Sequence, residues 1–320
     1  GSGFIPDTSQ QLSGLSMGDA AWADMDGDGD QDLLMTGEIS PRHSLTAVYR
    51  NNAGTLTPTS HPGIPHLSLG HCRWADFDND GDRDFILTGF NEVVGFQGVI
   101  GKNDGQGNFV PVSNPLYSTR DWTSLAVGDF DGDGLPDIAF SDISPRLAEG
   151  MRTRILKNVG ALNFSVVSAA VPGLYEGSLN FGDQDGDGKK DLLVTGSGVT
   201  THAAVYRCQG GQFLATSASF RGVGQGDAVW ADFDQDGDLD VVLSGKTDAG
   251  LSTLFFQNSG GNLALAQGPT LMPALYHSRL AVADWNADGY PDFVVIGQDA
   301  ADKPQAYLAM WNNSLQTFKF

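Results

Sequence analysis

Residues 24–32 read Asp-Met-Asp-Gly-Asp-Gly-Asp-Gln-Asp, and this acidic stretch decides the fold because the chain repeats its pattern six times. The shared pattern is D-x-D/N-x-D-G-x-x-D. Successive copies begin 52, 53, 54, 49 and 52 residues apart, so six such units account for nearly all of the 320 residues. Regular self-similarity of this kind indicates a repeat architecture. We number the copies loop 1 to loop 6, at residues 24–32, 76–84, 129–137, 183–191, 232–240 and 284–292.

Short apolar runs surround each loop. Residues 33–37 (Leu-Leu-Met-Thr-Gly) follow loop 1, and residues 20–23 (Ala-Ala-Trp-Ala) precede it. Apolar runs of this length that end at glycine indicate buried strands rather than helices. A third run enters an Asn-Asn-Ala-Gly turn at residues 51–54, which is hairpin chemistry, and a fourth run follows such turns in other units. Each unit is therefore predicted to form four strands, with the acidic loop between the first and the second.

Repeated four-stranded units of roughly 40 to 55 residues predict a β-propeller. We therefore expect an all-β, six-bladed β-propeller that forms a single domain over residues 1–320. Six loops favour six blades, and seven blades are the alternative. Both ends of the chain offer a strand that would complete the last blade, at residues 3–6 (Gly-Phe-Ile-Pro) and 315–318 (Leu-Gln-Thr-Phe).

The acidic loop and the hairpin at residues 49–54 (Tyr-Arg-Asn-Asn-Ala-Gly) together resemble a known repeat. They are similar to the FG-GAP/VCBS repeats of bacterial secreted proteins, which are relatives of the integrin α-subunit propeller. The resemblance covers essentially the whole chain. It implies an integrin-like, calcium-binding β-propeller.

The spacing of the acidic residues also points to calcium without the resemblance. Oxygen ligands at positions 1, 3, 5 and 9, with glycine at position 6 for a sharp turn, suit a hard cation of the size of Ca²⁺. Position 7 varies freely, which fits a ligand supplied by the backbone carbonyl. An EF-hand is excluded because Met35 stands where its glutamate would be, and a strand follows instead of a helix.

We therefore expect about six calcium ions, one in each loop, with a structural rather than a catalytic role. Asn286 replaces aspartate at position 3 of loop 6, so this site has one charge fewer and should be weaker. The predicted ligands, including the carbonyls at position 7, are Asp24, Asp26, Asp28, Asp30 and Asp32; Asp76, Asp78, Asp80, Asp82 and Asp84; Asp129, Asp131, Asp133, Leu135 and Asp137; Asp183, Asp185, Asp187, Lys189 and Asp191; Asp232, Asp234, Asp236, Asp238 and Asp240; and Asp284, Asn286, Asp288, Tyr290 and Asp292.

The overall charge has the same origin as the loops. The chain carries 18 Lys+Arg against 39 Asp+Glu, a formal charge of −21, and 35 of its acidic residues are aspartates. Of these, 23 stand at predicted ligand positions 1, 3, 5 and 9. The acidic balance argues against nucleic acid and anionic membrane surfaces as partners. No apolar run approaches the roughly 18 residues of a membrane span, so we expect no membrane insertion.

Basic and titratable side chains gather in the connections away from the acidic loops. In a propeller the turns after the first and third strands emerge on one face, and the other connections emerge on the opposite face. Three of the opposite connections end in Leu-Tyr, and an aromatic face with a polar tip suits a sugar or a peptide, although each tyrosine could also simply cap a strand. The candidate ligand-binding residues on that face are Tyr117, Tyr175, Tyr276, His277 and Arg279.

Two classes of function remain open. The first is a calcium-stabilised extracellular binding module, such as an adhesion, lectin-like or protein-interaction domain. We expect it to be monomeric and secreted or on the cell surface, with a glycan or an extracellular protein as its ligand.

The second is a polysaccharide lyase or other carbohydrate-active enzyme, for which Tyr276, His277 and Arg279 supply a base and a group that neutralises a carboxylate. No signature indicates that these three act together, so we assign no catalytic residue and favour binding. A scaffold without a ligand of its own is a third possibility.

The two cysteines, Cys72 and Cys208, are too few for a disulfide-stapled scaffold. We expect two free, buried thiols.

Overall fold

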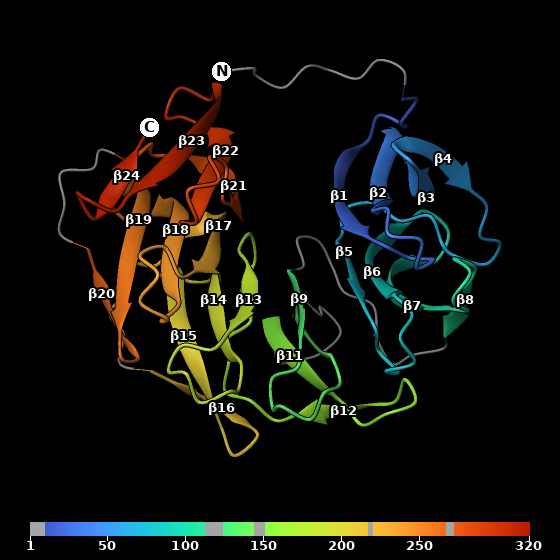
Figure 1. The fold of residues 1–320 in the computed structure, drawn as a ribbon, viewed down its shortest axis with the longest axis horizontal. Coiled ribbons are helices and arrows are strands. Elements are labelled where there is room, and N and C mark those ends of the chain that lie inside the picture. The colour runs from blue at the N-terminus through green and yellow to red at the C-terminus, as the bar shows by residue number, and fades with distance from the viewer. Residues whose placement is uncertain (1–9, 113–123, 144–150, 217–219, 267–271) are drawn as a thin grey trace. The chain divides into compact units, whose positions relative to one another are not determined.

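The computed structural model describes residues 10–112, 124–143, 151–216, 220–266 and 272–320 (Figure 1). Within these ranges the chain forms 24 β-strands and no helix. The strands pair into six four-stranded antiparallel sheets, and each sheet is a meander of four consecutive strands. We call these sheets blade 1 to blade 6. This arrangement confirms the prediction of an all-β, six-bladed β-propeller with one acidic loop for each blade.

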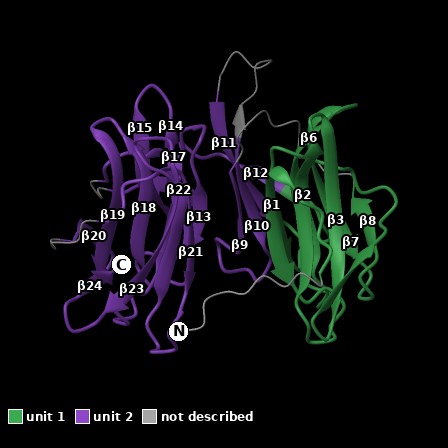
Figure 2. Ribbon diagram, turned by 90° about the horizontal axis from the view of Figure 1, so that it is seen from above, with its two compact units in different colours: residues 1–123, 158–164 green, residues 124–157, 165–320 purple. Residues whose placement is uncertain are grey.

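Residues 1–123 and 158–164 form one compact unit, coloured green in Figure 2. It contains two complete blades and the turn between the third and fourth strands of a third blade. Blade 1 consists of β1 (Ser16–Ala23), β2 (Asp32–Ser40), β3 (His43–Asn52) and β4 (Thr55–Thr59). Blade 2 consists of β5 (Cys72–Ala75), β6 (Asp84–Asn91), β7 (Gly95–Asn103) and β8 (Phe109–Val112).

Residues 124–157 and 165–320 form a second compact unit, coloured purple in Figure 2. Blade 3 consists of β9 (Leu125–Gly128), β10 (Asp137–Ile143), β11 (Met151–Asn158) and β12 (Phe164–Val167). Blade 4 consists of β13 (Leu179–Gly182), β14 (Asp191–Ser197), β15 (Thr201–Gln209) and β16 (Gln212–Ala215). Blade 5 consists of β17 (Gly224–Ala231), β18 (Asp240–Thr247), β19 (Gly250–Ser259) and β20 (Asn262–Leu265). Blade 6 consists of β21 (Tyr276–Ala283), β22 (Asp292–Gln298), β23 (Pro304–Asn312) and β24 (Thr317–Lys319).

The C-terminal strand β24 completes blade 6 by pairing with β23, as expected for residues 315–318. The other candidate, residues 3–6, lies outside the described residues.

The strand register places every acidic loop in the turn between the first and second strands of its blade. In each blade the residue before the first aspartate pairs with the last aspartate. The six pairs are Ala23–Asp32, Ala75–Asp84, Gly128–Asp137, Gly182–Asp191, Ala231–Asp240 and Ala283–Asp292. The predicted position of the loops is therefore confirmed.

The second strands form the centre of the core. Six consecutive residues of β6, of β14 and of β18 are buried, because these strands are covered on both faces. Aromatic residues at position 2 of the loops extend this core, since Phe77, Phe130 and Phe233 are fully buried. Cys72 and Cys208 are free and buried, as predicted. Among the described residues, no helix has the length and apolar character that crossing a membrane requires.

Candidate metal centres

The first aspartate of each loop organises the loop backbone. Its Oδ2 atom accepts a hydrogen bond from the N–H of the glycine at position 6 in all six loops, at 2.8–3.0 Å. The glycine has a φ angle between +83° and +98°, a region that disfavours side chains. The predicted sharp turn at position 6 is therefore present in every loop.

Position 4 of every loop is also left-handed, which the sequence pattern does not reveal because its residue type varies. Its φ angle lies between +57° and +79°. Glycine tolerates this conformation, whereas other residues adopt it at a cost in free energy. The six residues are Gly27, Asn79, Gly132, Gly186, Gln235 and Ala287.

The last aspartate of each loop is buried and fastens the loop to its own sheet. Its side chain is at most 1% exposed in all six loops. One carboxylate oxygen accepts the N–H of position 2, at 2.8–3.2 Å. In five blades the other oxygen accepts an N–H from the end of the third strand, at 2.7–2.9 Å. The five pairs are Asn51–Asp32, Asn103–Asp84, Cys208–Asp191, Asn258–Asp240 and Trp311–Asp292.

Burial of the last aspartate makes its ionisation unfavourable. It raises the pKa of Asp84 and Asp191 to about 6 and that of Asp240 to about 7, although the two backbone hydrogen bonds oppose the shift. The neighbouring carboxylates of the same loop raise these pKa values further. A cation bound among these carboxylates would favour their charged form.

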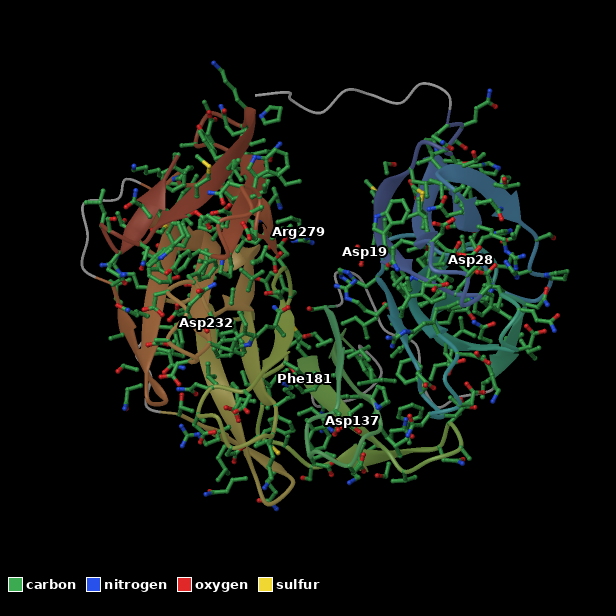
Figure 3. All side chains as sticks on the ribbon, in the orientation of Figure 1. Asp19, Asp28, Asp137, Phe181, Asp232 and Arg279 are labelled. Carbon is green, nitrogen blue, oxygen red and sulfur yellow. The ribbon has the colours of Figure 1, made fainter. Side chains whose placement is uncertain are left out.

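Three carboxylates converge in five of the loops, with one oxygen from each lying within 4.8 Å of the others. Positions 1, 3 and 9 supply the group in loops 1 to 4, and positions 1, 3 and 5 supply it in loop 5. Among the described residues, loop 6 brings no three carboxylates this close, since Asn286 occupies its position 3. Asp28 of loop 1 and Asp232 of loop 5 are labelled in Figure 3. The groups are Asp24, Asp26 and Asp32; Asp76, Asp78 and Asp84; Asp129, Asp131 and Asp137; Asp183, Asp185 and Asp191; and Asp232, Asp234 and Asp236.

The carboxylate at position 3 has a buried oxygen that no donor satisfies. This holds for Oδ1 of Asp26, Asp78, Asp131 and Asp185, the four equivalent residues of loops 1 to 4. Their side chains are only 10–20% exposed. A buried acceptor without a partner is costly, and it is more costly when the group is charged. Each of these four residues also belongs to one of the converging groups, so its unpaired oxygen is available to a ligand.

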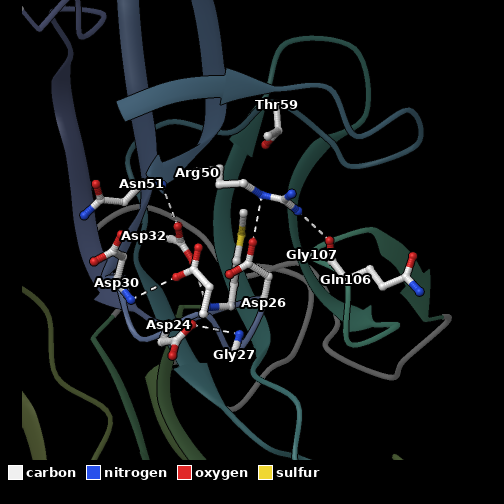
Figure 4. A network of polar contacts seen from close by, with 12 residues as sticks. Asp24, Asp26, Gly27, Asp30, Asp32, Arg50, Asn51, Thr59, Gln106 and Gly107 are labelled. Atoms are coloured by element: carbon white, nitrogen blue, oxygen red, sulfur yellow. Dashed lines mark hydrogen bonds and ion pairs between the residues drawn. The ribbon is translucent and has the colours of Figure 1, made fainter. Parts of the chain in front are cut away.

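A cation from the third strand contacts position 3 in four blades, a contact that was not predicted from the sequence. Arg50 Nε lies 2.9 Å from Asp26 Oδ2 in blade 1 (Figure 4). Arg207 Nη1 lies 3.1 Å from Asp185 Oδ2 in blade 4. In blades 2 and 3 the equivalent residues are lysines, and they contact positions 3 and 5 together. Lys102 pairs with Asp78 and Asp80, and Lys157 pairs with Asp131 and Asp133. The sequence does contain a pattern from which this contact could have been predicted, because in blades 1 to 3 a basic residue directly precedes the asparagine of the hairpin.

Three of the loops also contact the next blade along the chain, through an asparagine of that blade. Asn103 of blade 2 donates its side-chain amide to Met25 O of loop 1, at 2.7 Å. Asn158 donates to Phe77 O of loop 2 at 2.7 Å, and Asn258 donates to Gln184 O of loop 4 at 2.8 Å. The loop conformation therefore controls contacts between blades as well as the turn within a blade.

A family model for the FG-GAP-like repeat matches residues 24–87, 76–140, 183–243 and 232–295, which together cover more than half of the chain. The chain belongs to the FG-GAP-like repeat family. Each matched segment begins at the first aspartate of one loop and extends into the unit that follows it. No curated protein matches the sequence of this FG-GAP-like chain.

Solved structures of known proteins share the fold at low sequence identity. The chain is similar to the fungal lectin of Aleuria aurantia, a six-bladed β-propeller with a fucose recognition mode, at 11% identity and a TM-score of 0.51 over 97% of this chain and 96% of that chain. It is also similar to a mercury derivative of the fucose-specific lectin of Aleuria aurantia, at 10% identity and a TM-score of 0.51 over 95% and 94%. A thermostable family-43 glycoside hydrolase is similar at 11% identity and a TM-score of 0.40 over 83% and 97%, a likeness too low to support an argument. These identities show a shared fold only.

The candidate ligand residues away from the acidic loops are only partly brought together in this FG-GAP-like chain. The rings of Tyr276 and His277 lie 4.8 Å apart at the start of β21, and Arg279 follows on the same strand (Figure 3). The Tyr276 hydroxyl donates to the carboxylate of Asp302, and this hydrogen bond raises the pKa of Tyr276. Tyr175 bridges to Ser197 through its backbone in blade 4. Tyr117 lies outside the described residues.

Proposed function

We propose that this FG-GAP-like chain is a calcium-stabilised binding propeller that works outside the cell and recognises glycans. One observation carries the calcium part of the proposal. In loops 1 to 4 the position-3 aspartate belongs to a group of converging carboxylates and has a buried oxygen that lacks a donor. A cation at that point would satisfy this oxygen and reduce the repulsion among the carboxylates.

The chemistry of the donors fits Ca²⁺. All the side chains that converge offer carboxylate oxygens, which hard cations prefer. The backbone N–H of position 7 donates to the carboxylate of position 5 in all six loops, at 2.9–3.1 Å, whatever the side chain at position 7. This shared backbone conformation supports the proposal that position 7 contributes its carbonyl.

The role of calcium would be structural. It would fix the turn between the first two strands and, through contacts such as Asn103–Met25, the packing of one blade on the next. Loops that need calcium in the millimolar range suit extracellular fluid, so we place the protein outside the cell, as a monomer. Native mass spectrometry in calcium should show about six bound ions per chain, one per loop. A chain that binds no calcium under these conditions would refute this part of the proposal.

A glycan is the ligand class that we favour. The lectin of Aleuria aurantia combines fucose recognition with a fold similar to this one, which supports a carbohydrate ligand here. Catalysis by Tyr276 is disfavoured, because a tyrosine base must lose its proton and the hydrogen bond to Asp302 raises its pKa. We therefore propose binding without turnover.

Two assays on the calcium-loaded chain test this proposal. A glycan array should detect binding, and incubation with uronate polymers should release no unsaturated product. Release of unsaturated product that Tyr276→Phe or His277→Ala abolishes would instead establish the lyase alternative.

A further inference from the structure

A cavity of about 800 Å³ lies between blades 4 and 5, on the side of the acidic loops. Loop 4 contributes Gln184, the third strand of blade 4 contributes Arg207, and the end of its fourth strand contributes Leu214 and Thr216. The turn and fourth strand of blade 5 line the opposite side through residues 261–265. All of these residues belong to one compact unit.

Three buried polar atoms of the lining residues make no hydrogen bond within the described structure. They are Gln184 Oε1, Arg207 Nε and Thr216 Oγ1. Gln184 is only 2% exposed, and its amide orientation is fixed because Nε2 donates to Gly261 O at 2.7 Å. Its carbonyl oxygen therefore remains as an acceptor, Arg207 Nε remains as a donor, and the Thr216 hydroxyl can act as either.

Gln184 is also an exception to the pattern of the repeat. It occupies position 2 of its loop, where the other five loops carry Met25, Phe77, Phe130, Phe233 and Trp285. In loops 1, 2, 3 and 5 the apolar side chain at this position is buried in the core, whereas a buried amide with an unpaired oxygen is unfavourable. Folding alone would be served better by the apolar residue, so the glutamine indicates a ligand that pairs with it.

The surroundings define the chemical class of that ligand. Arg207 is neutralised by Asp185, at 3.1 Å, so the lining does not call for an anion. Leu214 and Leu265 line the cavity, are 48% and 47% exposed overall, and offer an apolar contact. The hydroxyls of a sugar can donate to Gln184 Oε1 and accept from Arg207 Nε, while the C–H groups of a pyranose ring cover the leucines.

We propose that this cavity is a binding subsite for an uncharged pyranose residue of a glycan. The proposal rests on the glycan-binding function proposed above and places a site on the side of the acidic loops, away from Tyr276. Because loop 4 positions Gln184 between Asp183 and Asp185, the subsite depends on the conformation of a candidate calcium loop.

The test uses the intact, calcium-loaded chain and the methyl glycosides of fucose, galactose, mannose and N-acetylglucosamine. Titration is followed by NMR at the side-chain amide of Gln184, which is assigned by its loss in Gln184→Met. At least one glycoside should shift this signal at millimolar concentration. Gln184→Met, which installs the residue of loop 1, should weaken binding at least tenfold and should not lower the melting temperature. Thr216→Val gives a second probe that retains the shape of the side chain.

One variant serves as the control, and a second distinguishes the two candidate sites. Gln212→Met changes an exposed glutamine of the neighbouring strand β16 and should bind like the unaltered chain. Tyr276→Phe changes the other candidate ligand site, at the start of β21. If Gln184→Met and Thr216→Val bind normally while Tyr276→Phe does not, the subsite is refuted and glycan binding stands. If no glycoside and no glycan of an array binds the unaltered chain, both proposals fail.

Discussion

Gln257 Nε2 donates a hydrogen bond of 2.5 Å to Asp234 Oδ2, at the place where blades 1 to 4 present an arginine or a lysine to the equivalent carboxylate. Loop 5 therefore keeps its carboxylates without an internal positive charge. In loops 1 to 4 a bound calcium ion would share the position-3 carboxylate with a lysine or an arginine. We infer that loop 5 binds calcium most tightly.

Exchanging these side chains should change calcium affinity in opposite directions. Gln257→Lys should weaken one site by about tenfold, and Lys102→Gln should strengthen one site by about tenfold, because a unit charge beside a divalent ion is added or removed. Isothermal titration calorimetry with a competing chelator measures both changes. Lys246→Gln, at an exposed position of β18, alters the net charge equally and should leave all sites unchanged. If Lys102→Gln and Lys246→Gln changed calcium affinity equally, the affinity would depend only on net charge, and the prediction would be wrong.

Loop 6 should be the weakest calcium site. Asn286 supplies a neutral oxygen, and its amide nitrogen donates to Asp288 Oδ2 at 3.0 Å. The variant Asn286→Asp should restore the missing charge and strengthen this site by about tenfold. Titration of the unaltered chain should resolve one weaker site, which disappears in the variant. Six equal affinities in the unaltered chain would refute the prediction.

Ala287 is strained by its backbone conformation. Its φ angle is +57°, at the left-handed position 4 where three other loops have glycine. Ala287→Gly should therefore raise the free energy of unfolding by about 0.5–1 kcal/mol, the left-handed penalty less the entropy cost of glycine. Denaturant unfolding in the presence of calcium measures this change in the free energy of unfolding. Ala300→Gly, at an exposed alanine without a positive φ, should be neutral or slightly destabilising.

Asp19 of β1 joins blades 1 and 2 and predicts a pH dependence. Burial disfavours its charge, but the hydrogen bond with His71 and the charge of Arg73 at 2.6 Å outweigh burial and lower its pKa. Because the pKa is lower in the folded state, the stabilisation is present above the unfolded value of 3.8 and is lost as the pH falls toward the folded value. Asp19→Asn should therefore destabilise the chain clearly at pH 7 and progressively less as the pH falls below about 4. A difference in unfolding free energy that stays constant down to pH 2 would contradict this assignment.

The fold could be predicted from the sequence because the spacing of the acidic loops and the spacing of the apolar runs indicate the same repeating unit. The spacing of the aspartates defined the units, and the apolar runs defined their strands, so the register Ala23–Asp32 and its five equivalents followed directly. Position 6 was predictable for the same reason, since only glycine recurs there.

The remaining features depend on contacts between residues far apart in the chain. The pairing of Lys157 with Asp131, across 26 residues, becomes visible only when the third strand folds beside the loop. Asp240 is buried and accepts hydrogen bonds that hold the loop against its sheet. This burial follows from tertiary packing rather than from the place of Asp240 in the motif. Gln184 was not predicted from the sequence, where it differs from the other loops only in replacing an apolar residue, and its unpaired oxygen is visible only in the structure.

The central claim is that calcium holds the loops and, through them, the blades. A site that binds an ion at about one hundred times its dissociation constant contributes about 2.7 kcal/mol, and several sites add to this. Thermal unfolding of the intact chain in millimolar calcium and in excess chelator tests the claim most directly. We predict that the chelator lowers the melting temperature by about 10 °C or more, since ~1 kcal/mol shifts it by about 2–4 °C in a domain of this size. A melting temperature that the chelator leaves unchanged would contradict the account.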